Sequence, residues 1–217
     1  MMLPTHALGG MLLALPAALA VPEFSGVALA AGFLGGVLPD LDMYAGHRRT
    51  LHYPVYYSAL ALPAAAAAGL FPSVATVAVA TLLLAAAGHS VADVFGGGLE
   101  LRPWEGNSRR AVYDHHRGRW IAPRRWIRYD GSPADLLLSA AIAAPLLVAV
   151  DGLAVDGPYP ALVGGTLAVA AAYAALRRTL PAVAERVVSL LPERTAAYLP
   201  ARYRASGDAR AASAPER

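Results

Sequence analysis

Six long apolar stretches, separated by short polar segments, constrain the fold of this chain more than any other feature. They cover residues 6–21, 25–38, 54–70, 74–93, 135–150 and 158–176. Hydrophobic residues make up 57% of the 217 residues and charged residues only 15%, a balance that excludes an ordinary soluble protein. Because a helix needs about 20 residues to cross a bilayer core, the first two stretches are short. The pattern predicts an all-α, polytopic membrane helix bundle of about six apolar helices.

The distribution of arginine predicts how this bundle is oriented. All 18 basic residues are arginine. If every stretch crosses the bilayer and the N-terminus is cytoplasmic, two arginines lie in segment 39–53, eight in 94–134 and eight after 176, all of them interior. Positive charge favours the cytoplasmic side of membrane proteins. We therefore expect a multi-pass protein of the cytoplasmic membrane with both termini in the cytoplasm.

The chain divides into three predicted parts. Residues 1–180 form the membrane-embedded helical domain, which includes a folded cytoplasmic cap at 94–134, since unstructured loops of that length are uncommon. The arginines and tryptophans of the cap favour either a headgroup or phosphate contact surface or simple interfacial anchoring. Residues 181–204 have the spacing of an interfacial amphipathic helix, and residues 205–217 have the composition of a disordered tail.

An alternative interpretation of the N-terminus is a cleaved signal peptide, because Ala18-Leu19-Ala20 follows an apolar run. No arginine or lysine precedes Arg48, however, so the positively charged start of a signal peptide is missing. We therefore expect His6 to remain in the mature chain.

Histidines and aspartates recur at the ends of the apolar stretches. Polar groups beside apolar helices are costly to desolvate unless they meet each other, water or a metal. His89 and Asp93 are four residues apart, which places them on one face of a helix. Each small group alone also fits an ordinary helix-end hydrogen bond or a solvated turn. Together, on one predicted membrane face, they favour a shared metal site whose candidate ligands are His6, Asp40, Asp42, His47, His52, His89 and Asp93.

The ligand types restrict the metal and suggest roles. The chain has no cysteine, so the ligands are imidazole nitrogen and carboxylate oxygen. This mixture suits one or two divalent ions, zinc first, with manganese or iron as alternatives. Asp42, His52 and Arg48 are the candidate catalytic residues, with Arg48 suited to steadying phosphate charge. Asp114-His115-His116 in the cap is a further candidate, either for an added metal ligand or for a proton shuttle.

These motifs resemble those of the YdjM-like family of membrane-bound metal-dependent hydrolases, some of which are described as LexA-binding and inner-membrane-associated. The resemblance rests on Thr5-His6, Leu38-Pro39-Asp40-Leu41-Asp42, a His-Arg-x-x-x-His element from His47 to His52, and a His-x-x-x-Asp element from His89 to Asp93. Leu51 and Tyr53 stand where the family commonly has threonine and serine. The resemblance implies an all-helical membrane protein, a hydrolase activity and a distant likeness to zinc-dependent phospholipase C.

Three functions follow as hypotheses. The first is a metal-dependent hydrolase acting on a phosphoester, including a lipid headgroup, at the cytoplasmic membrane face. The second is a non-enzymatic membrane-anchored regulator or scaffold that binds a soluble protein through the arginine-rich loop. Ion transport is less favoured, because the middles of the apolar stretches carry no charged residue. The expected partners are the lipid bilayer and a phosphoester or lipid substrate, with a soluble protein as a further candidate and no nucleic acid.

Overall fold

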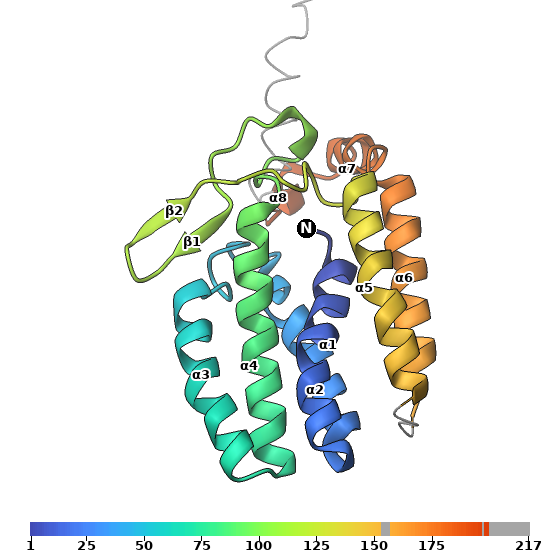
Figure 1. The fold of residues 1–217 in the computed structure, drawn as a ribbon. Helices are drawn as coiled ribbons and strands as arrows, with labels where there is room; N and C mark the ends of the chain where they lie inside the picture. The colour runs from blue at the N-terminus through green and yellow to red at the C-terminus, as the bar shows by residue number, and fades with distance from the viewer. Residues whose placement is uncertain (153–156, 197, 200–217) are drawn as a thin grey trace, which may run out of the picture.

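The computed structural model describes residues 1–152, 157–196 and 198–199, and it confirms the predicted all-α bundle. Each predicted apolar stretch is one long helix, and the helices lie side by side (Figure 1). They are α1 (Leu3–Ala20), α2 (Ser25–Val37), α3 (Pro54–Leu70), α4 (Val74–Ala92), α5 (Pro133–Gly152) and α6 (Tyr159–Leu176). The predicted tail, residues 205–217, lies outside the described residues.

Five helical segments are long and apolar enough to cross a membrane. Four of them are α1, α4, α5 and α6, and the fifth is Pro22–Asp42, in which 3-10 turns extend α2 at both ends. Helix α1 reaches 18 residues because it begins at Leu3, before the apolar run, and so takes Thr5 and His6 into its first turns. Helix α3 is apolar but has 17 residues. Length and composition therefore support membrane association for the bundle.

Helices α1 and α2 approach each other closely at glycines. A methyl group on Gly10 would lie 2.1 Å from the carbonyl oxygen of Gly32, and one on Gly36 would lie 2.3 Å from the carbonyl oxygen of His6. Small residues let helix backbones meet in membrane proteins, where packing replaces the hydrophobic driving force. This contact brings His6 directly against the end of α2, from which the next site residues follow.

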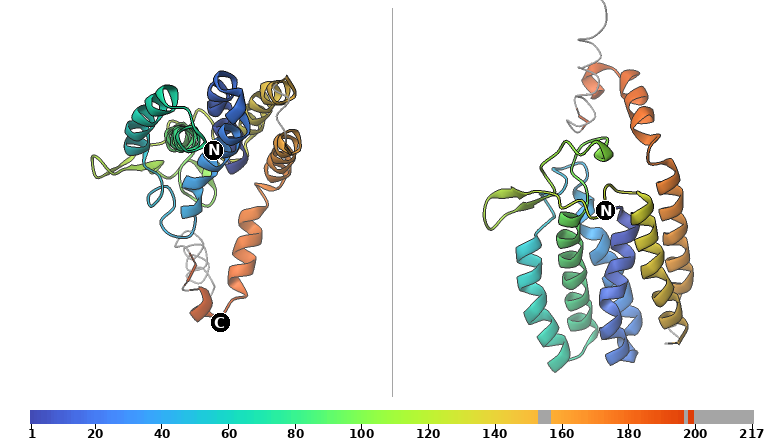
Figure 2. Two further views of the ribbon diagram at one scale, coloured as in Figure 1. Left: turned by 90° about the horizontal axis from the view of Figure 1, so that it is seen from below. Right: turned by 45° about the horizontal axis from the view of Figure 1, so that its top comes forward.

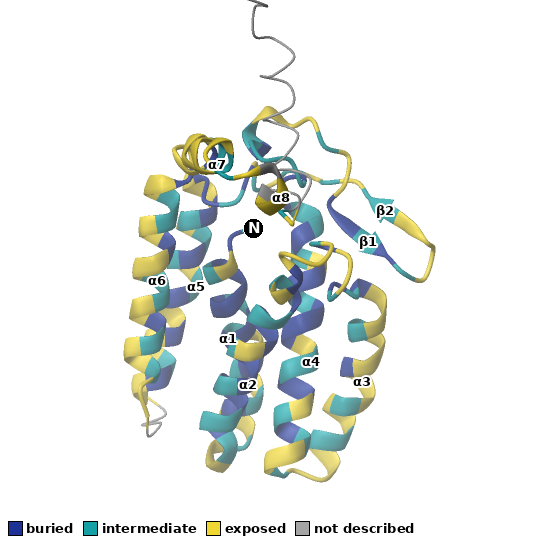
Figure 3. Ribbon diagram, turned by 180° about the vertical axis from the view of Figure 1, so that it is seen from behind, coloured by how far each residue is buried: buried dark blue, intermediate teal, exposed yellow. Residues whose placement is uncertain are grey.

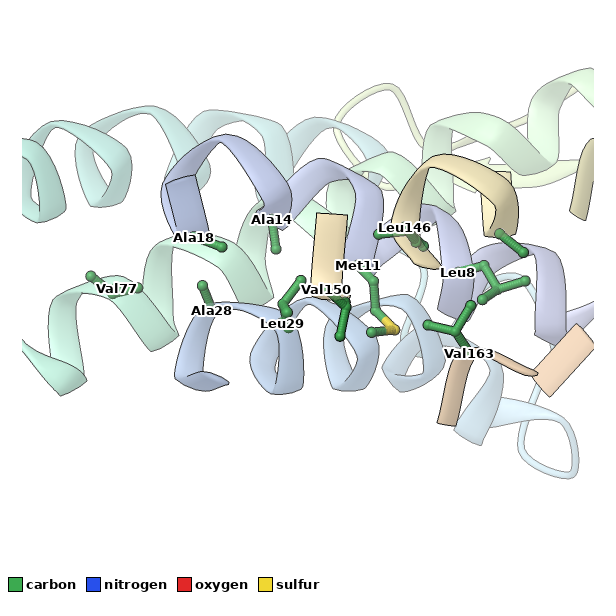
Figure 4. Close-up of a cluster of buried hydrophobic side chains, with 11 residues drawn as sticks. Leu8, Met11, Ala14, Ala18, Ala28, Leu29, Val77, Leu146, Val150 and Val163 are labelled. Carbon is green, nitrogen blue, oxygen red and sulfur yellow. The ribbon is translucent and has the colours of Figure 1, made fainter. Parts of the chain in front are cut away.

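The hydrophobic core lies between α1, α2 and the helices packed on them (Figure 4). Leu8 and Met11 of α1, Leu29 of α2, Val77 of α4 and Leu146 of α5 are fully buried there. Helices α3 and α6 lie at the outside of the bundle and carry more exposed residues (Figure 3). Their exposed side chains are apolar, as a bilayer environment requires.

The cap is a folded segment at the end of the bundle where α1 begins (Figures 1 and 2). It contains 3-10 turns at Asp93–Phe95 and Pro103–Glu105 and an antiparallel hairpin of β1 (Val112–Asp114) and β2 (Arg119–Ile121), in which Tyr113 pairs with Trp120. Helices α7 (Leu180–Ser189) and α8 (Glu193–Ala196) lie at the same end (Figure 1). The arginine-bearing segments that the structure describes thus share one end of the bundle. Its assignment to the cytoplasm stays a prediction.

Ion pairs attach the cap to the last helices. Arg177, at the end of α6, makes a two-pronged pair with Asp130 at 2.8 and 3.1 Å. Arg102 of the cap lies 2.7 Å from Glu185 of α7. The Arg177 guanidinium also lies 5.4 Å above the ring of Trp104, a cation–π distance. These contacts fix the cap and α7 relative to each other above the bundle.

The close approach of α1 and α2 predicts a sharp difference between two neighbouring glycines. Gly10→Ala should destabilise the protein by about 1–3 kcal/mol, because the new methyl group meets the Gly32 backbone. Gly9→Ala is the matched control, since a methyl group there has nothing within 4 Å and alanine favours helix by about 1 kcal/mol. Thermal unfolding of the detergent-solubilised protein measures both. Equal unfolding midpoints for the two variants would contradict the packing described here.

Candidate metal centre

Three segments bring the predicted site residues to the cap end of the bundle. The first turns of α1 carry His6, and the end of α4 with the following 3-10 turn carries His89 and Asp93. The connection between α2 and α3 carries the other four, Asp40, Asp42, His47 and His52. Pro39 lies within the 3-10 turn that ends α2, and Pro54 opens α3, so both ends of this connection are set by proline.

Four side chains converge on one point: Asp40, His52, His89 and Asp93. The Nε2 of His52 lies 3.6 Å from Asp40 Oδ1 and 3.4 Å from Asp93 Oδ2. The Nε2 of His89 lies 3.4 Å from Asp40 Oδ1 and 3.6 Å from Asp93 Oδ2. A tetrahedral ion with ligand distances of about 2.0–2.2 Å would space its ligands by about 3.3–3.6 Å. The four histidine-to-carboxylate separations therefore fit the ligand spacing of one divalent ion, and the remaining two pairs of ligand atoms lie within 4.8 Å of each other.

The inward-facing atoms of this group lack hydrogen-bond partners. His52 Nε2, His89 Nε2 and Asp93 Oδ2 are buried and make no hydrogen bond among the described residues, although Arg48 Nε lies 3.1 Å from Asp93 Oδ2 as an ion pair. Buried polar atoms are normally satisfied, so three unsatisfied atoms facing one point need an explanation. A divalent cation at that point would satisfy all three.

The other ring nitrogens fix how these histidines are turned. His89 Nδ1 lies 2.7 Å from the carbonyl oxygen of Gly36, which can only accept, so Nδ1 carries the proton and the neutral ring presents the Nε2 lone pair to the centre. His52 Nδ1 lies 3.0 Å from Asp42 Oδ2. Such contacts orient metal-binding histidines and raise their basicity. Both rings are thus held in the tautomer that a metal ligand needs.

Asp42 acts on the centre through its neighbours. Its two oxygens also lie 3.0 Å from His47 Nδ1, 3.1 Å from the Leu51 amide and 3.3 Å from the Arg48 amide. With both oxygens engaged, Asp42 is outside the converging group of four. Asp42 instead holds the loop through these contacts and orients His52.

His6 and Arg48 lie against Asp93. His6 Nε2 is 3.0 Å from Asp93 Oδ1, and its ring stacks on His89 with 3.6 Å between ring centres. Arg48 Nε is 3.1 Å from Asp93 Oδ2, and its Nη1 donates to the carbonyl oxygen of Gly97. Of the seven predicted ligands, His6, Asp42 and His47 lie around the four that converge. Metal binding by these three residues stays a prediction.

The charge of the site attracts a cation. Three carboxylates, Asp40, Asp42 and Asp93, face two fixed cations, the Arg48 guanidinium and the terminal ammonium of Met1, which lies 2.6 Å from Asp93 Oδ1, so one negative charge is left at the end of an apolar bundle. Burial lowers the pKa of both His47 and His52, but for His52 the carboxylates of Asp42, which its Nδ1 contacts at 3.0 Å, and of Asp93 outweigh burial and raise the pKa. The excess of carboxylate around His52 is the same charge that would attract a divalent ion.

The hairpin of the cap supports the loop that carries His47 and His52. The Tyr113 amide donates to the carbonyl oxygen of Arg48, and His115 Nε2 lies 2.6 Å from that of Arg49. Arg48 has a positive φ of 60°, a strained conformation for a residue with a side chain, and this contact helps to hold it. Asp114 accepts from the His116 and Arg117 amides in the hairpin turn. The Asp114-His115-His116 segment therefore supports the loop from outside the group of four.

Sequence reasoning missed three residues that matter here. Gly36 supplies the carbonyl oxygen that orients His89, and no side-chain pattern could show it. Asp135 accepts from Thr5 Oγ1 at 2.7 Å and from the Met2 amide at 2.8 Å, which fixes the start of α1 beside His6. The Ser-x-x-Asp pattern at Ser132 was a detectable signal for it. Glu100 has both carboxylate oxygens buried without a partner.

Comparison of the chain with protein-family models, curated proteins and solved structures gives no match. The resemblance to the YdjM-like family therefore stays a prediction that rests on its motifs. The case for a metal centre stands on the geometry alone.

The geometry predicts which substitutions reduce metal binding. His52→Ala removes one of the converging atoms, Asp93→Asn replaces an anionic ligand oxygen by a neutral amide, and each should abolish stoichiometric binding of zinc. Asp42→Asn leaves the four in place but weakens the orientation of His52, so zinc affinity should fall about 10–100-fold. Metal content by mass spectrometry and zinc titration measure these effects in the purified protein.

The control for these variants is His116→Ala, which removes an exposed histidine of the cap and should leave zinc binding unchanged. Full zinc occupancy in both His52→Ala and Asp93→Asn, in folded protein, would rule out this centre.

Proposed function

We propose that this protein is a membrane-embedded, metal-dependent hydrolase that acts on a phosphoester. The single observation that carries the proposal is the convergence of Asp40 with three buried atoms that make no hydrogen bond, at histidine-to-carboxylate separations of 3.4–3.6 Å. A cluster that served only to join helices would be expected to satisfy its own polar atoms. This consideration favours a metal site over the scaffold alternative.

The metal would supply the chemistry that these residues cannot. A divalent ion lowers the pKa of a bound water and polarises a phosphoryl oxygen. Two histidines and two carboxylates suit zinc, and manganese or iron would also accept them. Asp40 is the least enclosed of the four, with its side chain 10% exposed, so substrate would approach from its side.

The surrounding residues suit a phosphoester. Arg48 lines a cavity that also reaches Asp40, and a guanidinium can hold phosphate oxygens as the metal draws them in. In the reaction, water oxygen bonds to phosphorus, the bond from phosphorus to the leaving oxygen breaks, and that oxygen takes up a proton. The products are an alcohol and a phosphate. His47 also lines this cavity, with Nδ1 3.8 Å from Asp40 Oδ1.

Hydrolysis of p-nitrophenyl phosphate and bis(p-nitrophenyl) phosphate by the zinc- or manganese-loaded protein tests the proposal. Turnover should disappear with a chelator and return with metal. His89→Ala should reduce kcat/KM at least about 100-fold, because it removes a ligand from the ion that stabilises the transition state. His116→Ala should keep full activity. A fully metal-loaded protein that hydrolyses neither compound would contradict the proposal.

A further inference from the structure

An apolar cavity begins at the candidate metal centre and extends to the last helices of the bundle. Its volume is about 590 Å³, in the range of cavities that enclose small-molecule ligands. Asp40, His47 and Arg48 line its polar end. The walls farther away come from the start of α1, from α6 and from α7, which lie at the same end of the bundle (Figure 2).

Most of the far lining of the cavity is hydrophobic, and Tyr173 and the Asp130–Arg177 ion pair interrupt it. Leu3 of α1, Val169 of α6 and Leu180, Val183 and Ala184 of α7 form its hydrophobic part. No charged side chain is contributed by α7 to this lining, although Glu185 follows Ala184 directly. Glu185 instead pairs with Arg102 of the cap at 2.7 Å. The cavity therefore offers a metal-ligand end and an apolar end to one molecule.

The apolar end is open to the outside of the bundle. Val169 is 60% exposed and Val183 is 55% exposed, although both line the cavity. Val169 belongs to α6, one of the helices long and apolar enough to cross a membrane, and Val183 belongs to α7, which follows it. The exposed apolar side chain of Val169 on α6 would meet lipid chains in a bilayer. Entry from the side, directly from the membrane, suits an acyl chain.

The polar end matches a headgroup. Arg48 and the candidate metal would receive phosphate oxygens. Asp130 is already paired with Arg177, so its charge does not oppose a phosphate. Glu100 also lines the cavity, and its carboxylate oxygens make no hydrogen bond among the described residues, so it opposes a phosphate close to it but can accept from a hydroxyl or amine of a headgroup.

We infer that the substrate is a membrane lipid phosphoester, whose headgroup phosphate reaches the metal centre while an acyl chain occupies the cavity between α1, α6 and α7. The inference rests on the proposed function for its reaction. Lipid binding rests separately on the cavity, so lipid binding and hydrolysis can be tested independently.

Binding of two probes to the metal-loaded protein tests the inference. Dioleoyl phosphatidic acid and glycerol 3-phosphate carry the same phosphate on the same glycerol and differ by the acyl chains. Native mass spectrometry of delipidated protein in detergent should show at least tenfold tighter binding of the lipid. Ala184→Trp, which fills the cavity, should reduce lipid binding at least tenfold and leave glycerol 3-phosphate binding and metal content unchanged.

Ala182→Trp is the matched control, because Ala182 lies on the same helix, is exposed and does not line the cavity. It should bind the lipid as the unmodified protein does. Val169→Trp gives a second, independent obstruction from α6 should Ala184→Trp fail to fold, which thermal unfolding reports. Equal lipid affinity in Ala184→Trp, Val169→Trp and Ala182→Trp, or no preference for lipid over glycerol 3-phosphate, would overturn the inference.

The outcomes separate the two proposals. Lipid binding that depends on Ala184 in a protein without hydrolytic activity would retain the cavity and reject the hydrolase. Hydrolysis of the soluble phosphoesters with no effect of Ala184→Trp on lipid binding would retain the hydrolase and reject the lipid site.

Discussion

Burying the carboxylates of Asp42 and Asp93 at the end of an apolar helix bundle is the constraint on which the rest of the structure depends. Each side chain is 1% exposed or less, and an unpaired charge in such a place is very costly. Asp42 is compensated by two imidazoles and two backbone amides. Asp93 is compensated on one oxygen by the terminal ammonium of Met1 and by His6, while its other oxygen lies 3.1 Å from Arg48 Nε and faces the proposed metal.

The helix packing serves this arrangement. The glycine contacts between α1 and α2 bring His6 and Gly36 close enough for His6 to reach Asp93 and for Gly36 to orient His89. The cap hairpin then supports the left-handed conformation of Arg48, because the Tyr113 amide donates to the carbonyl oxygen of Arg48 and His115 Nε2 lies 2.6 Å from that of Arg49. Packing, loop and cap thus act on the same few side chains from three directions.

Much of the fold could be predicted from the sequence, because apolar length alone defines a membrane-sized helix. The six stretches correspond to α1–α6, and the seven polar residues lie at one end of the bundle. The sequence did not separate His52 and His89, which converge, from His6 and His47, which surround them. Whether a histidine joins the group of four depends on which of its ring nitrogens meets Asp42 or the Gly36 carbonyl oxygen. The position of the backbone sets this, and the sequence does not show it. The cavity was equally hidden, since it arises where α7 packs near the start of α1.

The central claim is that Asp40, His52, His89 and Asp93 hold one metal ion. Anomalous scattering from crystals of the zinc-loaded protein, recorded on both sides of the zinc absorption edge, tests this claim most directly. The account predicts one peak at about 2.0–2.2 Å from His52 Nε2, His89 Nε2 and a carboxylate oxygen each of Asp40 and Asp93. No peak at that point, or one bound only by His47 and exposed groups, would contradict it.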